Sequence, residues 1–285
     1  MRFNGARTAA LLVGMSALIV VVGGALGGRT GLVVALVIAL STNGIAYFAG
    51  DRIALSAMRA RPVSEVEQTA MYGIVRELST AARQPMPRLY VSPTRAPNAF
   101  ATGRNPRRAA VCCTMGILQI LDKRELRSVL AHELSHVHNR DILISSVAGG
   151  LAAVVTLAAN LAWFIPLGNS DDEDGPGLLG ALLLMILGPI AATIIQLAIS
   201  RTREFQADAS GARLSGDPLG LAAALRKIES GTRRLPLPGD GRLASAGHLM
   251  IANPFRGEGL VRLFSSHPPI AERVARLEQM AGYRR

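Results

Sequence analysis

The residues best suited to chemistry lie in the run 131–136, which contains the pattern His-Glu-x-x-His. Side chains four positions apart on an α-helix lie about 40° apart around its axis, so His132 and His136 share one face. Two imidazoles placed in this way can bind one Zn²⁺ ion, and Glu133 lies beside them as a candidate general base. The pattern therefore predicts a metal site that activates water for hydrolysis.

A catalytic zinc site needs a third protein ligand and one open position. His138 lies about 240° around the helix from His132, so it cannot face the same ion. Glu204 and Asp208 are one helical turn apart in a later segment. We predict Glu204 as the third ligand and Asp208 as the acceptor that fixes the tautomer of one ligand histidine. Glu133 is the predicted base, which takes the proton of water and passes it to the leaving amine of a peptide.

Four stretches without Asp, Glu, Lys or Arg predict membrane-spanning helices, because each offers about the 20 apolar residues that cross a bilayer. The spans are placed near residues 8–27, 31–49, 142–165 and 178–200. The mean hydropathy of +0.30 agrees with this assignment. A cleaved signal peptide is the alternative for the first stretch, and the second span that follows at once argues against it.

Basic residues set the orientation of these spans. Arg2 and Arg7 precede the first span, and residues 51–141 and 201–285 hold 14 Lys or Arg each. The loop 166–176 holds none and carries four acidic residues. The positive-inside rule therefore places both termini and both long segments in the cytoplasm, and the acidic loop outside. The net charge of +11 then reflects topology and attraction to anionic lipid, and we expect no nucleic-acid partner.

The predicted organisation is a cytoplasmic domain divided by a membrane hairpin. Residues 1–50 form two N-terminal spans, and residues 51–141 the first part of the domain, with the His-Glu-x-x-His helix. Residues 142–200 form the hairpin, and residues 201–285 the second part, with the third ligand. The hairpin returns its ends to one side of the membrane, so Glu204 can meet the histidines. The predicted fold is a multi-pass membrane protein, mainly α, with a cytoplasmic zincin-like α+β metalloprotease domain that carries a small sheet.

Local patterns predict the elements of this domain. Ser64 and Glu67 form a capping box at the start of an amphipathic helix. Helices are expected over 64–83, 121–139, 201–214 and after the step Pro268-Pro269, and strands over 89–91, 99–102 and 109–114. Residues 230–247 are rich in Gly, Pro and Arg, which indicates a mobile surface segment. Cys112 and Cys113 alternate across a strand, and we interpret both as small core residues.

The chain resembles the HtpX-type membrane zinc endopeptidases of bacterial heat-shock quality control. The resemblance is carried by residues 97–103, 132–141, 203–208 and 266–269, together with the two pairs of spans. It implies a zinc metalloendopeptidase with one Zn²⁺ per chain. The enzyme would lie in the cell membrane of a bacterium and degrade damaged or misfolded membrane proteins at the cytoplasmic face. A more distant resemblance is to the CAAX prenyl-protein endopeptidases, which share the zinc site and an Asn-containing strand but have more membrane spans.

The resemblance gives roles to two further residues. Asn98 begins a strand that would line the substrate cleft, where an exposed edge can pair with an extended peptide. His267 matches the histidine of the family's C-terminal His-Pro motif and could donate to the developing oxyanion. Without the resemblance, Asn98 is interpreted as a turn residue after Pro97, and His267 as a helix cap or a packed polar residue before the Pro-Pro step.

Other functions fit the pattern less well. A non-catalytic membrane scaffold with a structural metal site would close the fourth metal position with a protein ligand, and Glu133 would have no role. An intramembrane protease would carry the motif inside an apolar span, but Arg127 and Arg140 flank it here. A transporter would carry ionisable residues within its spans. Unfolded or damaged proteins and the lipid bilayer are the expected partners, and the sequence indicates no oligomeric state.

Overall fold

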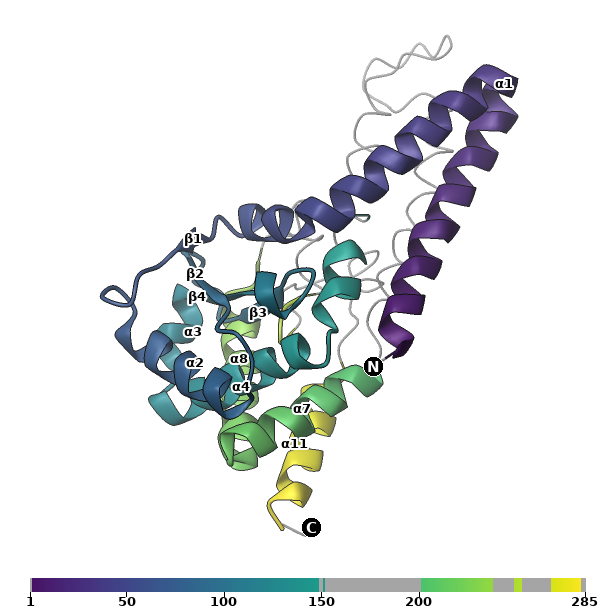
Figure 1. Ribbon diagram of the computed structural model, residues 1–285. Coiled ribbons are helices and arrows are strands. Elements are labelled where there is room, and N and C mark those ends of the chain that lie inside the picture. Colours follow the sequence, from purple (N-terminus) through teal and green to yellow (C-terminus); the bar gives the residue numbers. More distant parts are fainter. Residues whose placement is uncertain (1, 149–150, 152–200, 238–248, 253–267, 283–285) are drawn as a thin grey trace, which may run out of the picture.

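The computed structural model describes residues 2–148, 151, 201–237, 249–252 and 268–282. Within these residues the chain forms a helical hairpin, a four-stranded sheet and a group of helices packed beside the sheet (Figure 1). Most of the predicted third span, the whole of the predicted fourth span and His267 lie outside the described residues.

The first helix, α1 (Arg2–Ala57), reverses direction at Gly28. Gly28 has a φ of +54°, a left-handed conformation that glycine adopts without a Cβ clash. The two arms lie side by side and are joined by hydrogen bonds. Asn43 Nδ2 donates to the Leu12 carbonyl at 3.2 Å and to Ser16 Oγ at 2.7 Å. Figure 1 shows this hairpin projecting away from the sheet and the other helices. The reversal lies where the sequence predicts the break between the first two spans.

Part of α1 has the character of a membrane span. The stretch Gly28–Ala57 is long and apolar enough to cross a bilayer, and Thr8–Val21 is a shorter apolar stretch. Large apolar side chains of the longer stretch face outward, for example Val33 at 60% and Leu40 at 63% exposure. Such a surface is unfavourable in water and ordinary in lipid. The described residues therefore contain one clear candidate for a membrane helix.

The small sheet has four strands in the order β1-β2-β4-β3. The strands are β1 (Arg61–Pro62), β2 (Arg88–Ser92), β3 (Ala99–Thr102) and β4 (Ala110–Thr114). β2 and β4 are parallel, and the other two pairs are antiparallel. The prediction of a small sheet is confirmed, and β3 forms one of its edges. Cys112 and Cys113 are fully buried in two different apolar clusters, as their alternation on β4 predicts.

The helices of the domain are α2, α3, α4, α7, α8 and α11. Their bounds are Thr69–Ala81, Met115–Ile120, Lys123–His138, Arg201–Ser215, Pro218–Arg234 and Ile270–Met280. A short 3₁₀ turn, Pro106–Arg108, precedes β4.

Three predicted boundaries need correction. The capping contacts between Ser64 and Glu67 form, at 2.8 and 3.3 Å, but the regular helix begins only at Thr69, after a turn. The helix predicted over 121–139 begins at Lys123, because Asp122 and Glu125 form their own capping box. The first five residues of the predicted mobile segment 230–247 belong to α8, so that prediction is wrong there.

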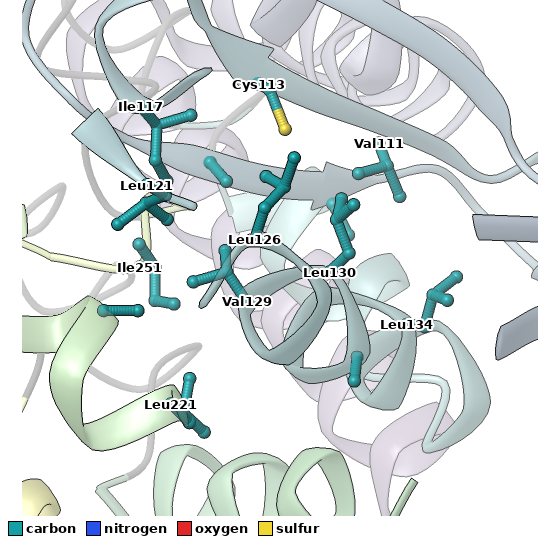
Figure 2. Packing of buried hydrophobic residues seen from close by; sticks show 14 of the residues in the cluster. Val111, Cys113, Ile117, Leu121, Leu126, Val129, Leu130, Leu134, Leu221 and Ile251 are labelled. Atoms are coloured by element: carbon teal, nitrogen blue, oxygen red, sulfur yellow. The ribbon is translucent and has the colours of Figure 1, made fainter. Parts of the chain in front are cut away.

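Helix α4 lies at the centre of the main apolar core. Its residues Leu126 and Leu130 point toward the strand that carries Val111 and Cys113 (Figure 2). The same cluster includes Leu221 of α8 and residues of α2 and α11. Each fully buried aliphatic side chain of this kind stabilises the fold by about 1.5–3 kcal/mol. The helix that carries His132 and His136 is therefore held rigidly on several sides.

Helix α7 packs closely against α4, as Figure 1 shows. A methyl group at Gly211 of α7 would lie 2.7 Å from the Cα atom of His132 and 2.8 Å from its backbone nitrogen. Only glycine allows this approach, because real Cβ atoms do not come so near to backbone atoms. The close approach brings Glu204 and Asp208, on the same helix, to the two histidines.

Replacing Gly211 by Ala should lower the free energy of unfolding by about 1–3 kcal/mol and weaken metal binding, because the new methyl group pushes α7 away from α4. Gly73→Ala is the matched control, since Gly73 lies in α2 with no atom within 4 Å of an added Cβ. We expect this control to be neutral or more stable by up to about 1 kcal/mol. Thermal unfolding in detergent measures both variants, and equal stability of the two would contradict the close packing.

Candidate metal centre

The three predicted metal ligands lie together. The ligand atoms of His132, His136 and Glu204 are all within 4.8 Å of one another. The two Nε2 atoms are 3.2 Å apart, and the Glu204 carboxylate oxygens lie 3.9 Å from the first and 3.6 Å from the second. Two imidazole nitrogens and one carboxylate oxygen this close together form a donor set that suits Zn²⁺. Such a set leaves a fourth coordination position for water or substrate.

Each histidine has a carboxylate behind it. His132 Nδ1 lies 3.0 Å from Oδ1 of Asp208, the residue predicted to orient a ligand histidine. His136 Nδ1 lies 3.5 Å from Asp141 Oδ2, and the carboxylate of Asp141 is buried. A carboxylate on Nδ1 leaves Nε2 free to face a metal. The sequence indicates an interfacial anchor for Asp141, whereas the structure places this residue after the end of α4 with its carboxylate directed at His136.

A buried arginine on α11 completes the centre. Arg273 is fully buried and donates to Asp208 through Nε at 2.8 Å and Nη2 at 2.7 Å. A third donor, Nη1, bonds to the Ile251 carbonyl at 2.7 Å. The guanidinium also lies 3.8 Å from Glu204 Oε2. It therefore neutralises part of the negative charge that the ligands and their partners bring into the interior.

Sequence reasoning missed Arg273, although a signal was present. Ile270, Val274 and Leu277 form the apolar face of α11, and Arg273 lies between them on that same face. A charged residue on the buried face of a helix indicates a buried partner, because an unpaired charge there is costly. The identity of that partner could not be read from the helix alone.

The environment shifts the pKa values of the titratable groups in different directions. Burial lowers the pKa of His132, and this outweighs the effect of Asp208. Burial acts in the same direction on His136, but Asp141, Glu204 and Glu133 overcome it and raise the pKa of His136 to about 9. Burial would raise the pKa of Asp208, but Arg273 holds it well below its usual range. The centre thus combines the ion pair of Asp208 and Arg273 with two histidines whose pKa values are shifted in opposite directions.

Glu133 lies beside the ligands but is not one of them. Its side chain is buried, and burial raises the pKa of the carboxyl to about 7. The backbone N–H of Ala101, on β3, donates to the carboxylate. The other oxygen, Oε1, is buried and has no hydrogen-bond partner within the described part of the chain. A buried acceptor of this kind calls for a water molecule or a substrate group, so the residues present fit a hydrolytic metal site.

The outer edge of β3 is already engaged at several points. The Ala99 carbonyl accepts from Ile251 N–H at 3.0 Å, and the Gly103 N–H donates to Ser146 Oγ at 3.1 Å. Asn98, predicted to line the substrate cleft, is fully buried and donates from Nδ2 to the Ala252 carbonyl at 2.9 Å. The structure thus places Asn98 at the start of the expected strand, with its amide directed at another part of the chain.

Comparison with known families matches residues 65–281 to peptidase family M48. The chain is 60% identical over 289 residues to the protease HtpX homolog of Kineococcus radiotolerans, with 99% of this chain and 98% of that protein covered. It is 53% identical over 288 residues to the protease HtpX homolog of Paenarthrobacter aurescens, with 98% and 97% covered. The crystal structure of S. mikatae Ste24p aligns with a TM-score of 0.44 and 18% identity, and the match covers 97% of this chain and 64% of that one.

The chain therefore belongs to peptidase family M48. It is a membrane-bound metalloprotease, and the resemblance to HtpX proteases inferred from its motifs is confirmed. The family match and the nearly full-length similarity to HtpX homologs do not favour the scaffold or the CAAX-type alternative.

Replacing Arg273 by Gln should lower the free energy of unfolding by about 3–5 kcal/mol, because it leaves the Asp208 carboxylate buried without its cation. Metal affinity should fall by about 10- to 100-fold through the loss of orientation at His132. Arg276→Gln, on the same helix, is the control: that side chain is 54% exposed and pairs with Glu272. Its change should stay below about 1 kcal/mol. Urea unfolding in detergent and metal competition give both numbers, and similar losses in the two variants would refute the role of the buried pair.

Proposed function

We propose that the protein is a zinc-dependent endopeptidase that cleaves damaged or misfolded membrane proteins at the cytoplasmic face of a bacterial cell membrane. The observation that carries this proposal is the buried Glu133 carboxylate beside the cluster of His132, His136 and Glu204. One oxygen of that carboxylate has no hydrogen-bond partner in the described part of the chain, and Glu133 directly follows the potential ligand His132, an arrangement that suits metal-assisted hydrolysis. Protein substrates follow from membership of a peptidase family, and the preference for damaged ones is part of the proposal.

His132, His136 and Glu204 would hold one zinc ion. Zinc bound there supplies a Lewis acid that polarises a peptide carbonyl and makes water more acidic. Glu133 accepts a proton from the attacking water on its carboxylate and delivers it to the nitrogen of the leaving amine. The peptide C–N bond breaks, and the two products are a carboxylate and an amine.

The carboxylates behind the histidines would hold these rings in place. Asp208 keeps the Nδ1 proton of His132 on the side away from the metal, and Asp141 does the same for His136. His267 is proposed as a donor to the oxyanion, on the basis of the motif alone.

The membrane arrangement in this proposal has four spans, with both termini and the metal centre in the cytoplasm. The apolar arms of α1 support the first two spans. The distribution of Lys and Arg in the sequence supports the orientation, since the loop 166–176 has none. The charged residues Arg127 and Arg140 on either side of the motif support a metal centre at the membrane surface rather than within the bilayer.

Glu133→Gln should abolish proteolysis and leave metal binding intact, because the amide cannot accept a proton but keeps the size of the side chain. The protein is purified in detergent with chelator, and then tested with added Zn²⁺ on casein and on its own chain. Glu204→Gln is the comparison variant, and it should lose metal and activity together. Proteolysis by the Glu133 variant at more than about 1% of the wild-type rate would refute the assignment.

Topology can be tested with single cysteines in whole cells, because Cys112 and Cys113 are buried and should not react. Ser170→Cys lies in the predicted external loop and should react with a membrane-impermeant maleimide at once. Asn105→Cys, at an exposed turn of the domain, should react only after the membrane is permeabilised. Labelling of Asn105→Cys in intact cells would contradict the proposed orientation.

A further inference from the structure

Asn98 is held firmly at the start of β3. Its backbone carbonyl accepts from Thr114 N–H at 3.0 Å, and its N–H donates to Thr114 Oγ1 at 2.9 Å. These two bonds fix the backbone of Asn98 against β4. The side chain of Asn98 is fully buried. A buried amide needs hydrogen-bond partners for both its NH₂ group and its oxygen, so these partners identify the part of the chain that it stabilises.

The amide of Asn98 holds the backbone of a distant segment. Nδ2 donates to the Ala252 carbonyl at 2.9 Å, and Oδ1 accepts from the Ala252 N–H at 3.4 Å and from the N–H of the adjacent Ala99 at 3.1 Å. The neighbouring bond from Ile251 N–H to the Ala99 carbonyl, at 3.0 Å, adds a third connection. Residues 251 and 252 are thus bonded to the outer edge of β3. Ala252 lies 154 residues after Asn98 in the sequence.

The segment held by Asn98 holds Arg273 in turn. The Ile251 carbonyl accepts from Arg273 Nη1 at 2.7 Å, and the opposite edge of the guanidinium forms the two bonds to Asp208. Asp208 Oδ1 lies 3.0 Å from His132 Nδ1. An unbroken series of buried polar contacts therefore runs from Asn98 to a metal ligand. The guanidinium nitrogens of Arg273 lie 3.8 Å from Glu204 Oε2 and 3.5 Å from His132 Nε2. The Ile251 carbonyl is the neutral acceptor that fixes the guanidinium at these distances.

We propose that Asn98 is a positioning residue for the metal centre, which acts through residues 251–252, Arg273 and Asp208 on the imidazole of His132. Loss of the amide removes both side-chain bonds to Ala252 and leaves the Ile251 N–H bond to Ala99 as the remaining tie, so the Ile251 carbonyl that accepts from Arg273 is held less firmly. A cation that can move toward Glu204 and His132 competes with a metal for the same electron pairs. This inference rests on the proposed function, because it presumes that His132 binds a metal.

The test compares Asn98→Ala with the wild-type protein in detergent. Zinc affinity is measured by competition with a chelating dye, and the visible spectrum of the Co²⁺-loaded protein reports the ligand geometry. We expect Asn98→Ala to bind zinc about 10-fold or more weakly, with a shifted Co²⁺ spectrum. Thr102→Val is the matched control, since it removes a buried hydroxyl at the other end of β3, where Oγ1 contacts Ser146 Oγ rather than Asn98 or residues 251–252. It should keep zinc affinity within about twofold of the wild type.

A double-variant cycle separates positioning from general damage. If Asn98 acts through Arg273, the combination of Asn98→Ala with Arg273→Lys should bind zinc about as weakly as the weaker single variant. If the two residues act independently, their losses multiply. Asn98→Asp keeps the acceptor and the size of the side chain but cannot donate to Ala252, and it should lose about fivefold or more in affinity even if Asn98→Ala fails to fold.

Three outcomes overturn the inference. Unchanged zinc affinity and an unchanged Co²⁺ spectrum in both Asn98 variants would do so. A rise in KM for casein with normal zinc affinity would make Asn98 a substrate contact instead. A wild-type protein that binds no metal would overturn the proposed function as well, so the two failures are distinguishable.

Discussion

The metal centre depends on the close approach of two helix backbones, α4 and α7. His132 and His136 lie on one helix and Glu204 on the other, and Gly211 allows the helices to approach to a distance that no other residue permits. The sheet, α2 and α8 hold α4 from its remaining sides. Since the donor atoms must meet within a few ångströms, small movements of either helix would change the coordination more than the fold.

The buried Arg273 offsets part of the negative charge inside this centre. Glu133, Glu204 and Asp208 bring carboxyl groups into the interior, and Arg273 is the cation that is fully buried with them. Burial of a charge is tolerated only with excellent pairing, which the bidentate contact to Asp208 supplies. The contact with Arg273 also fixes the Asp208 carboxylate where its Oδ1 meets His132 Nδ1. Arg273 therefore both offsets the charge of Asp208 and orients the imidazole of His132 through it.

The sequence predicts those parts of the site that depend on spacing along one helix. Helical geometry places His132 beside His136 and Glu204 beside Asp208, and the hairpin argument brings the two pairs together. Arg273 and Asn98 have roles that depend on where α11 and residues 251–252 pack, and spacing carries no information about such distant contacts. The order of the strands and the helix Pro218–Arg234 were missed for a similar reason, because pairing partners and buried Ala-rich faces are chosen by the whole fold.

The outer edge of β3 is largely occupied from within. Ile251, Glu133 and Ser146 engage backbone groups at Ala99, Ala101 and Gly103. A polypeptide that enters beside Glu133 therefore meets few open main-chain positions, and it gains little binding energy from adding a strand. Under the proposed function, the stability of the substrate itself would then decide cleavage, because a segment that is already unfolded could enter without the binding energy of an added strand.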